Sequence, residues 1–139
     1  MNRSETRKVA FELIYSLEIQ KVEESELETQ INVFLEGKGI QDEKVTEYIQ
    51  DVIYGIEKNK NDILEQINKE LSEKWEFSRL SKISIAILKL AVYEILYKKL
   101  PYKVVINEAV ELAKAYGDDN APSFVNGILA SIVKNNNIE

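Results

Sequence analysis

The segment from Lys82 to Lys98 constrains the fold more than any other stretch. Its apolar residues cover most of the circumference of a helix, and they are Ile83, Ile85, Ala86, Ile87, Leu88, Leu90, Ala91, Val92, Ile95 and Leu96. A helix that is apolar nearly all round must be surrounded by other elements, because an open side would leave apolar surface in water. We therefore predict that residues 82–98 form a central core helix with neighbours on several sides.

The rest of the chain repeats its apolar residues at helical spacing, and no stretch alternates apolar and polar residues as a strand does. This pattern predicts about seven helices and an all-α fold. Trp75, Phe77 and Leu80 are expected to pack the segment that leads into the central helix. Polar residues stand where helices are expected to begin, and the candidate caps are Ser4, the Ser25–Glu28 pair, Asp42, Asn61 and either Ser78 or Ser81.

The composition excludes most catalytic chemistry. The sequence has no histidine and no cysteine, so imidazole and thiolate ligands, disulfides and a histidine general base are all absent. Adjacent carboxylates such as Asp118 and Asp119 are expected to point apart on solvated turns, and no Gly-rich phosphate loop occurs. We predict that the protein is not an enzyme and that it holds no metal and no cofactor.

The net charge of −6 is unevenly distributed, since residues 18–76 hold 16 of the 24 acidic residues and only 7 of the 18 basic ones. The first helix instead opens with Arg3, Arg7 and Lys8. Cations at a helix N-terminus oppose the macrodipole at a cost of about 0.3 to 1 kcal/mol, so these three are either simply solvated or face an anionic partner. No run reaches the roughly 20 apolar residues of a membrane span and no signal peptide is recognisable, which predicts a soluble cytoplasmic protein.

The stretch from Pro101 to Gly127 is the most distinctive in residue choice. Pro101 precedes an amphipathic helix, and Gly117 is expected to end it in a left-handed conformation before a second helix begins. Asn126 and Gly127 then interrupt that second helix, where glycine costs about 1 kcal/mol relative to alanine. The pattern indicates that something approaches this point closely, either a neighbouring helix or a ligand.

The residue pattern of this stretch, PYKVVINEAVELAKAYG followed seven residues later by FVNG, resembles the C-terminal signature of the NusB family of transcription antitermination factors. Ile14-Tyr15-Ser16, Asp51 with Gly55, and the run ILKLAVYE at residues 87–94 fit the same family. The resemblance covers essentially the whole chain. It implies a single domain over residues 1–139, with a leading three-helix bundle (about 1–58) and a trailing four-helix bundle (about 60–135) packed around the central helix.

The resemblance also implies a function. Members of this family pair with NusE, a small-subunit ribosomal protein, hold the boxA element of nascent RNA, and act with the RNA polymerase antitermination complex on ribosomal RNA operons. By the same resemblance, Tyr15 and the side of the core helix near Ser84, expected to be exposed, would meet NusE. The residues expected to contact RNA are Arg3, Arg7, Lys8, Lys103, Lys114, Asn120, Phe124 and Asn126.

Several alternatives stay open at this point. Phe124 is as consistent with a core aromatic as with a ring that stacks on an unpaired base, and Tyr15 is as consistent with core as with interface. A homodimer or a purely protein-binding helical module, with its RNA face covered or lost, would fit the same sequence. The RNA-binding domain of an RNA methyltransferase shares this fold, although a Rossmann domain would normally follow it.

Overall fold

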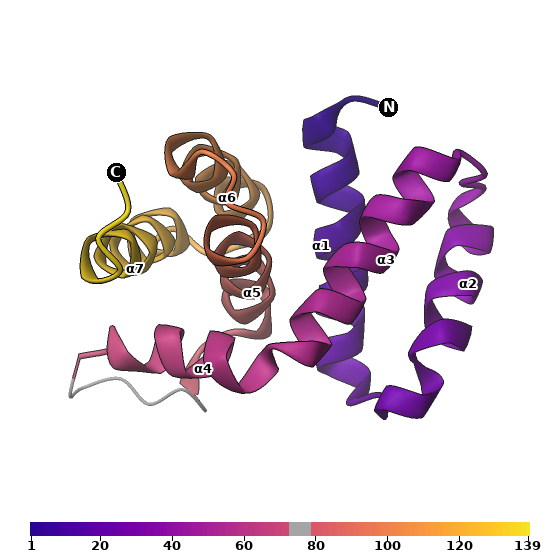
Figure 1. Ribbon diagram of the computed structural model, residues 1–139, viewed down its shortest axis with the longest axis horizontal. Coiled ribbons are helices and arrows are strands. Elements are labelled where there is room, and N and C mark those ends of the chain that lie inside the picture. Colours follow the sequence, from indigo (N-terminus) through magenta and orange to yellow (C-terminus); the bar gives the residue numbers. More distant parts are fainter. Residues whose placement is uncertain (73–78) are drawn as a thin grey trace.

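The computed structural model describes residues 1–72 and 79–139, and its described part is built of α-helices with no strand (Figure 1). Trp75, Phe77 and Ser78, for which the sequence predicted packing or capping roles, lie outside the described residues. The helices are α1 (Arg3–Gln20), α2 (Leu27–Lys38), α3 (Glu43–Lys58), α4 (Lys60–Lys69), α5 (Lys82–Leu96), α6 (Tyr102–Tyr116) and α7 (Ala121–Asn135), with a 3₁₀ turn at Glu24–Glu26. The predicted all-α fold and its seven helices are confirmed.

Helix α5 is the central helix, as its composition predicted. Residues 84–88 and 90–95 are all buried, and α5 packs against α1, α3, α4, α6 and α7. Figure 1 shows α1, α2 and α3 on one side of α5 and α6 and α7 on the other, with α4 running beneath them. The core is therefore continuous through α5, which belongs to both groups of helices.

Two of the predicted helix caps are confirmed. Asp42 Oδ1 accepts hydrogen bonds from the backbone N–H groups of Lys44 and Val45, at 2.8 and 3.3 Å, at the start of α3. Ser81 Oγ accepts the N–H of Ser84 at 3.1 Å at the start of α5. Each cap satisfies donors that the first turn of a helix leaves without a partner.

Three other predicted caps are wrong. Helix α1 begins before Ser4, because Asn2 forms a reciprocal capping box with Glu5. Ser25 lies in the 3₁₀ turn, and no side chain caps α2. Asn61 already lies inside α4, which starts at Lys60 and also lacks a side-chain cap.

Gly117 does not adopt the predicted left-handed conformation. Its φ of −91° and ψ of 179° are extended, so any residue could adopt its backbone geometry. Glycine is required there for space, because a Cβ would lie 2.5 Å from the Cβ of Ala121 and 2.9 Å from the carbonyl oxygen of Ala113. The tight connection between α6 and α7 depends on this close approach.

No helix in the described part of the chain is long and apolar enough to cross a membrane.

Candidate nucleic-acid interface

The three basic residues at the start of α1 divide between two sides of the helix. Arg3 and Arg7 are four residues apart and share one side, which turns toward α3 and α5. Ser4 and Lys8 share the next side, which turns toward α6. The single basic cluster that the sequence suggested is therefore two separate groups.

Arg7 is buried, which corrects its predicted role as an open phosphate contact. The residue is 6% exposed, and its Nε donates to Glu94 Oε1 of α5 at 2.8 Å. Glu94 is 1% exposed, and its second oxygen accepts a hydrogen bond from the Tyr48 hydroxyl of α3 at 3.2 Å. The three side chains thus join α1, α3 and α5 in one buried polar network.

The electrostatics of this network favour its present charge state. Burial acts to lower the pKa of Arg7, but the hydrogen bond and charge of Glu94 outweigh it, so the pKa of Arg7 is raised. Burial and the charge of Glu94 also raise the pKa of Tyr48, so its hydroxyl stays protonated. Arg7 is therefore a cation and Tyr48 a neutral donor at physiological pH.

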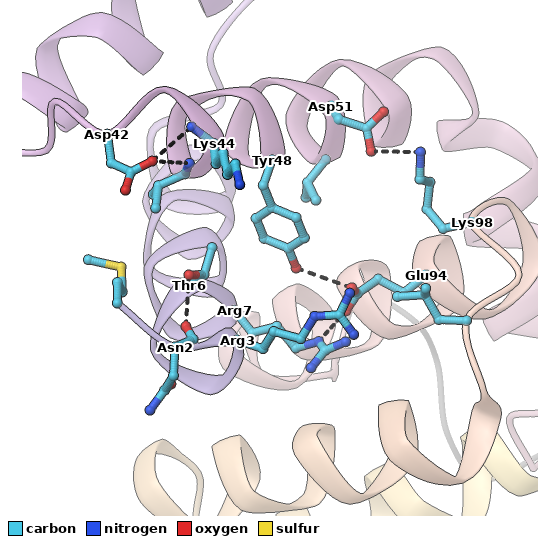
Figure 2. A pocket seen from close by; sticks show the side chains of 14 residues that line it. Asn2, Arg3, Thr6, Arg7, Asp42, Lys44, Tyr48, Asp51, Glu94 and Lys98 are labelled. Atoms are coloured by element: carbon cyan, nitrogen blue, oxygen red, sulfur yellow. Dashed lines mark hydrogen bonds and ion pairs between the residues drawn. The ribbon is translucent and has the colours of Figure 1, made fainter.

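A groove of about 500 Å³ opens beside the network (Figure 2). Arg3 and Arg7 both line this groove, together with Glu94 and Tyr48, and Figure 2 shows the Tyr48 hydroxyl and the Arg7 guanidinium directed toward Glu94. At one end, Lys98 pairs with Asp51 at 3.3 Å. The groove is lined by Met1, Asn2, Arg3, Thr6, Arg7, Asp42, Lys44, Val45, Tyr48, Asp51, Val52, Glu94, Lys98 and Leu100.

On the other side of α1, side chains meet α6 at two points. The hydroxyl of Ser4 donates to Glu108 at 2.7 Å, and the Lys8 ammonium lies 5.9 Å from the centre of the Tyr116 ring. Phe11 packs against the same ring, with centroids 4.9 Å apart. Lys8 is therefore exposed next to the end of α6, where the connection to α7 begins.

The start of α7 presents polar side chains close to that point. Asn120 and Asn126 are exposed, and Asn120 precedes the helix in a turn held by Asp118, whose Oδ1 accepts two backbone N–H groups at 3.0 Å. Phe124 is half-buried and packs against the core, so the structure is compatible with both readings of its ring. Lys114, in the last turn of α6, is exposed and loosely paired with Glu111 at 3.4 Å.

Lys103 lies apart from this group. It is exposed in the first turn of α6, at the opposite end of that helix from Lys114 and the α7 connection. The structure therefore brings Lys8, Lys114, Asn120 and Phe124 toward one end of α6, whereas Arg3 lies in the groove and Lys103 stands alone.

Gly127 is not required by the packing of this chain. A Cβ at this position would meet nothing within 4 Å, so no neighbouring helix needs the space. Gly127 and Asn126 are both exposed. Of the two explanations that the sequence left open, close packing of a helix is wrong.

The two residues expected to meet a protein partner differ in accessibility. Tyr15 is half-buried and stacks on the buried Phe11, with ring centroids 6.1 Å apart. Ser84 is 5% exposed, which corrects the expectation that it lies on an exposed side of α5. Ser84 therefore offers almost no surface of its own to a partner.

Sequence reasoning missed Glu94 and Tyr48, although a signal was present. Glu94 is the only acidic residue in a core helix made mostly of apolar residues, and a buried carboxylate requires a partner. Arg7 lies on the same stripe of α1 as the buried residues Ala10 and Ile14. Together these positions predict a buried ion pair.

No group of three or more His, Cys, Asp or Glu side chains that could hold a metal occurs among the residues described.

Comparisons with known proteins agree with this architecture. The model of the NusB family matches residues 4–134. The transcription antitermination protein NusB of Clostridium novyi is 43% identical over 136 residues, covering 96% of this chain and 99% of that protein. The solved structure of T. maritima NusB is 37% identical with a TM-score of 0.85, covering 96% of this chain and 92% of the other.

A second solved structure contains partners. A chain in a structure of the antitermination factors NusB and NusE in complex with double-stranded RNA is 28% identical, with a TM-score of 0.83 and coverage of 96% of both chains. The family model spans nearly the full length of the sequence, and the relatives match end to end. The chain therefore belongs to the NusB family.

Proposed function

We propose that this protein is an RNA-binding transcription antitermination factor that pairs with NusE on boxA RNA and supports processive transcription of ribosomal RNA operons in the cytoplasm. In this proposal residues 1–139 act as one domain, with the two helical groups joined through α5. Its similarity to a chain solved together with NusE and RNA supports the assignment. The named relatives are antitermination proteins, which supports the same process.

The observation that carries the RNA assignment is the group at the end of α6. Lys8 supplies a cation beside Tyr116, and Asn120, Phe124 and Asn126 stand at the start of α7. Together they offer a phosphate contact, amide groups that can bond to base edges, and a ring that can stack on an unpaired base. Such a mixture can contact unpaired bases as well as the phosphate backbone, whereas a purely cationic surface contacts the backbone alone.

The charge distribution supports a dependence on the partner. With a net charge of −6, the protein attracts RNA weakly by itself. Its acidic residues are concentrated between 18 and 76, where they favour association with a basic protein such as a ribosomal protein. We therefore expect tight RNA binding only when NusE is present.

Fluorescence anisotropy of a labelled boxA RNA tests this function. The protein is titrated alone and with NusE, against the boxA sequence and a scrambled RNA, at two salt concentrations. Sequence-dependent binding that appears mainly with NusE supports the adaptor function. If the folded protein binds neither RNA with or without NusE, the RNA assignment fails and a homodimeric or protein-only module becomes the better account.

Phe124→Ala is expected to weaken boxA binding by about 5- to 150-fold, because base stacking on an aromatic ring contributes about 1 to 3 kcal/mol. The matched control is Phe34→Ala. Phe34 is also half-buried and has a lysine ammonium, that of Lys38, 5.7 Å from its ring, but it lies on α2. Thermal denaturation should show a similar loss of stability for the two variants. Equal RNA affinity of the two variants would assign Phe124 to the core.

A further inference from the structure

The carboxylates of the groove between α1, α3 and α5 are already engaged. Glu94 pairs with Arg7 at 2.8 Å, and Asp51 pairs with Lys98 at 3.3 Å. Asp42 accepts the first backbone N–H groups of α3. None of the three carboxylates is therefore left without a partner to attract a cationic ligand.

Two cations of the groove have no such partner. Arg3 and Lys44 both line it, and neither side chain makes a hydrogen bond or ion pair within the described residues. Lys44 also stands in the first turn of α3, where the helix dipole disfavours a cation. The groove thus holds positive charge that its own carboxylates do not match.

Arg7 adds further hydrogen-bond donors to the groove. Among the described residues, Arg7 makes one hydrogen bond, from Nε to Glu94, although a guanidinium carries five N–H donors. No buried side-chain nitrogen or oxygen in the described part of the chain lacks a partner, so the two terminal nitrogens of Arg7 must be reached by solvent. Arg7 and Arg3 both line the groove (Figure 2), so this end of Arg7 can offer its donors there.

The remaining wall of the groove is apolar. Val45 and Val52 of α3 and Leu100, which precedes α6, line it together with the ring of Tyr48. A volume of about 500 Å³ lies within the range of pockets that hold small ligands. Unmatched cations above a partly apolar cavity fit a ligand that combines a phosphate with a flat ring.

We propose that this groove binds one nucleotide of single-stranded RNA, with its phosphate at Arg3, Arg7 and Lys44 and its base against Val45, Val52 and Leu100. The inference rests on the proposed function, and it extends the RNA contact to the stripe of α1 that borders the groove with α3 and α5. One strand passing over the amino-terminal turn of α1 reaches both sides, because Arg3 and Lys8 lie on adjacent stripes of the same helix. The nucleotide bound here flanks those held at the start of α7.

The test compares Lys44→Gln with Lys58→Gln in the full chain, using anisotropy of labelled boxA RNA with NusE over a series of salt concentrations. Both lysines are exposed on α3 and lack a side-chain partner, but only Lys44 lines this groove. Lys44→Gln should weaken binding about 3- to 5-fold and reduce the slope of log affinity against log salt by about 0.7. Lys58→Gln should leave both quantities unchanged.

A second variant tests whether the charge of the Lys44 side chain or its shape is responsible for the change in RNA affinity. The sequence has no cysteine, so Lys44→Cys creates a unique thiol. Attaching an aminoethyl group should restore affinity and salt slope, whereas attaching a sulfonatoethyl group should lower affinity further. If Lys44→Gln binds as tightly as the parent protein, or no more weakly than Lys58→Gln, the groove is not a nucleotide site although the RNA function stands. If the parent protein itself fails to bind boxA with NusE, the proposed function fails and the groove assignment fails with it.

Discussion

Replacing Glu94 with glutamine is expected to lower the free energy of unfolding by about 3 to 5 kcal/mol. The change keeps the shape of the side chain but removes the negative charge that faces Arg7. Both residues are buried, Arg7 at 6% and Glu94 at 1% exposure, so water cannot take the place of the lost carboxylate charge beside Nε of Arg7. Because whole domains are stable by only about 5 to 15 kcal/mol, this single atom-for-atom change removes a large fraction of the total.

The control replaces the whole network by apolar groups. A triple variant, Arg7→Met with Tyr48→Phe and Glu94→Leu, leaves no buried charge or hydroxyl without a partner. It should therefore be more stable than Glu94→Gln, although it carries more substitutions. Urea denaturation followed by circular dichroism measures all three proteins. A loss below about 1 kcal/mol for Glu94→Gln would mean that the pair is solvated and not buried.

The triple variant also tests whether the network of Arg7, Tyr48 and Glu94 contributes to RNA binding in addition to stabilising the fold. The triple variant keeps the fold but removes the terminal nitrogens that reach the groove. Its RNA affinity should fall, whereas its helix content should match that of the parent protein. A loss of affinity without a loss of fold would show that this network, and not only the fold that it supports, contributes to ligand binding.

A structural feature could be predicted from the sequence when the residues that form it lie close together in the chain. The helices and the core position of α5 follow from periodicity, which a single segment displays by itself. The caps at Asp42 and Ser81 follow from a residue and its next three neighbours. The cap at Ser4 was wrong because Asn2, two residues earlier, competes for the same turn and gains a reciprocal bond from Glu5.

The candidate site depends on long-range pairing. Arg7 and Glu94 are 87 residues apart, so no local pattern shows that one neutralises the other. The family resemblance correctly identified the family, yet it treated Arg3, Arg7 and Lys8 as one cluster. The structure divides them because a helix turns 100° per residue, which places Lys8 on a different side from Arg7. Composition alone cannot reveal that division.

Two of the helical glycines, Gly55 and Gly127, predict opposite effects of the same substitution. Gly55 of α3 faces Tyr93 of α5 so closely that a Cβ would lie 2.2 Å from the hydroxyl and 2.3 Å from the adjoining ring carbon. Tyr93 is 4% exposed and packs in the core, so making space for the Cβ requires its ring to shift against packed neighbours. Gly55→Ala should therefore destabilise the protein by about 1 to 2 kcal/mol, since overpacking outweighs the better helix propensity of alanine.

Gly127→Ala should instead stabilise the protein by about 0.5 to 1 kcal/mol, because the position is open and helical and alanine restricts the unfolded chain. The same variant should bind boxA RNA with NusE more weakly, because the added methyl group would stand between the helix backbone and a ligand at Asn126. Thermal denaturation and anisotropy measure the two effects on one sample. Higher stability with unchanged RNA affinity would show that no ligand approaches this backbone. Higher stability with lower affinity would explain a helical glycine that nothing in the folded chain requires.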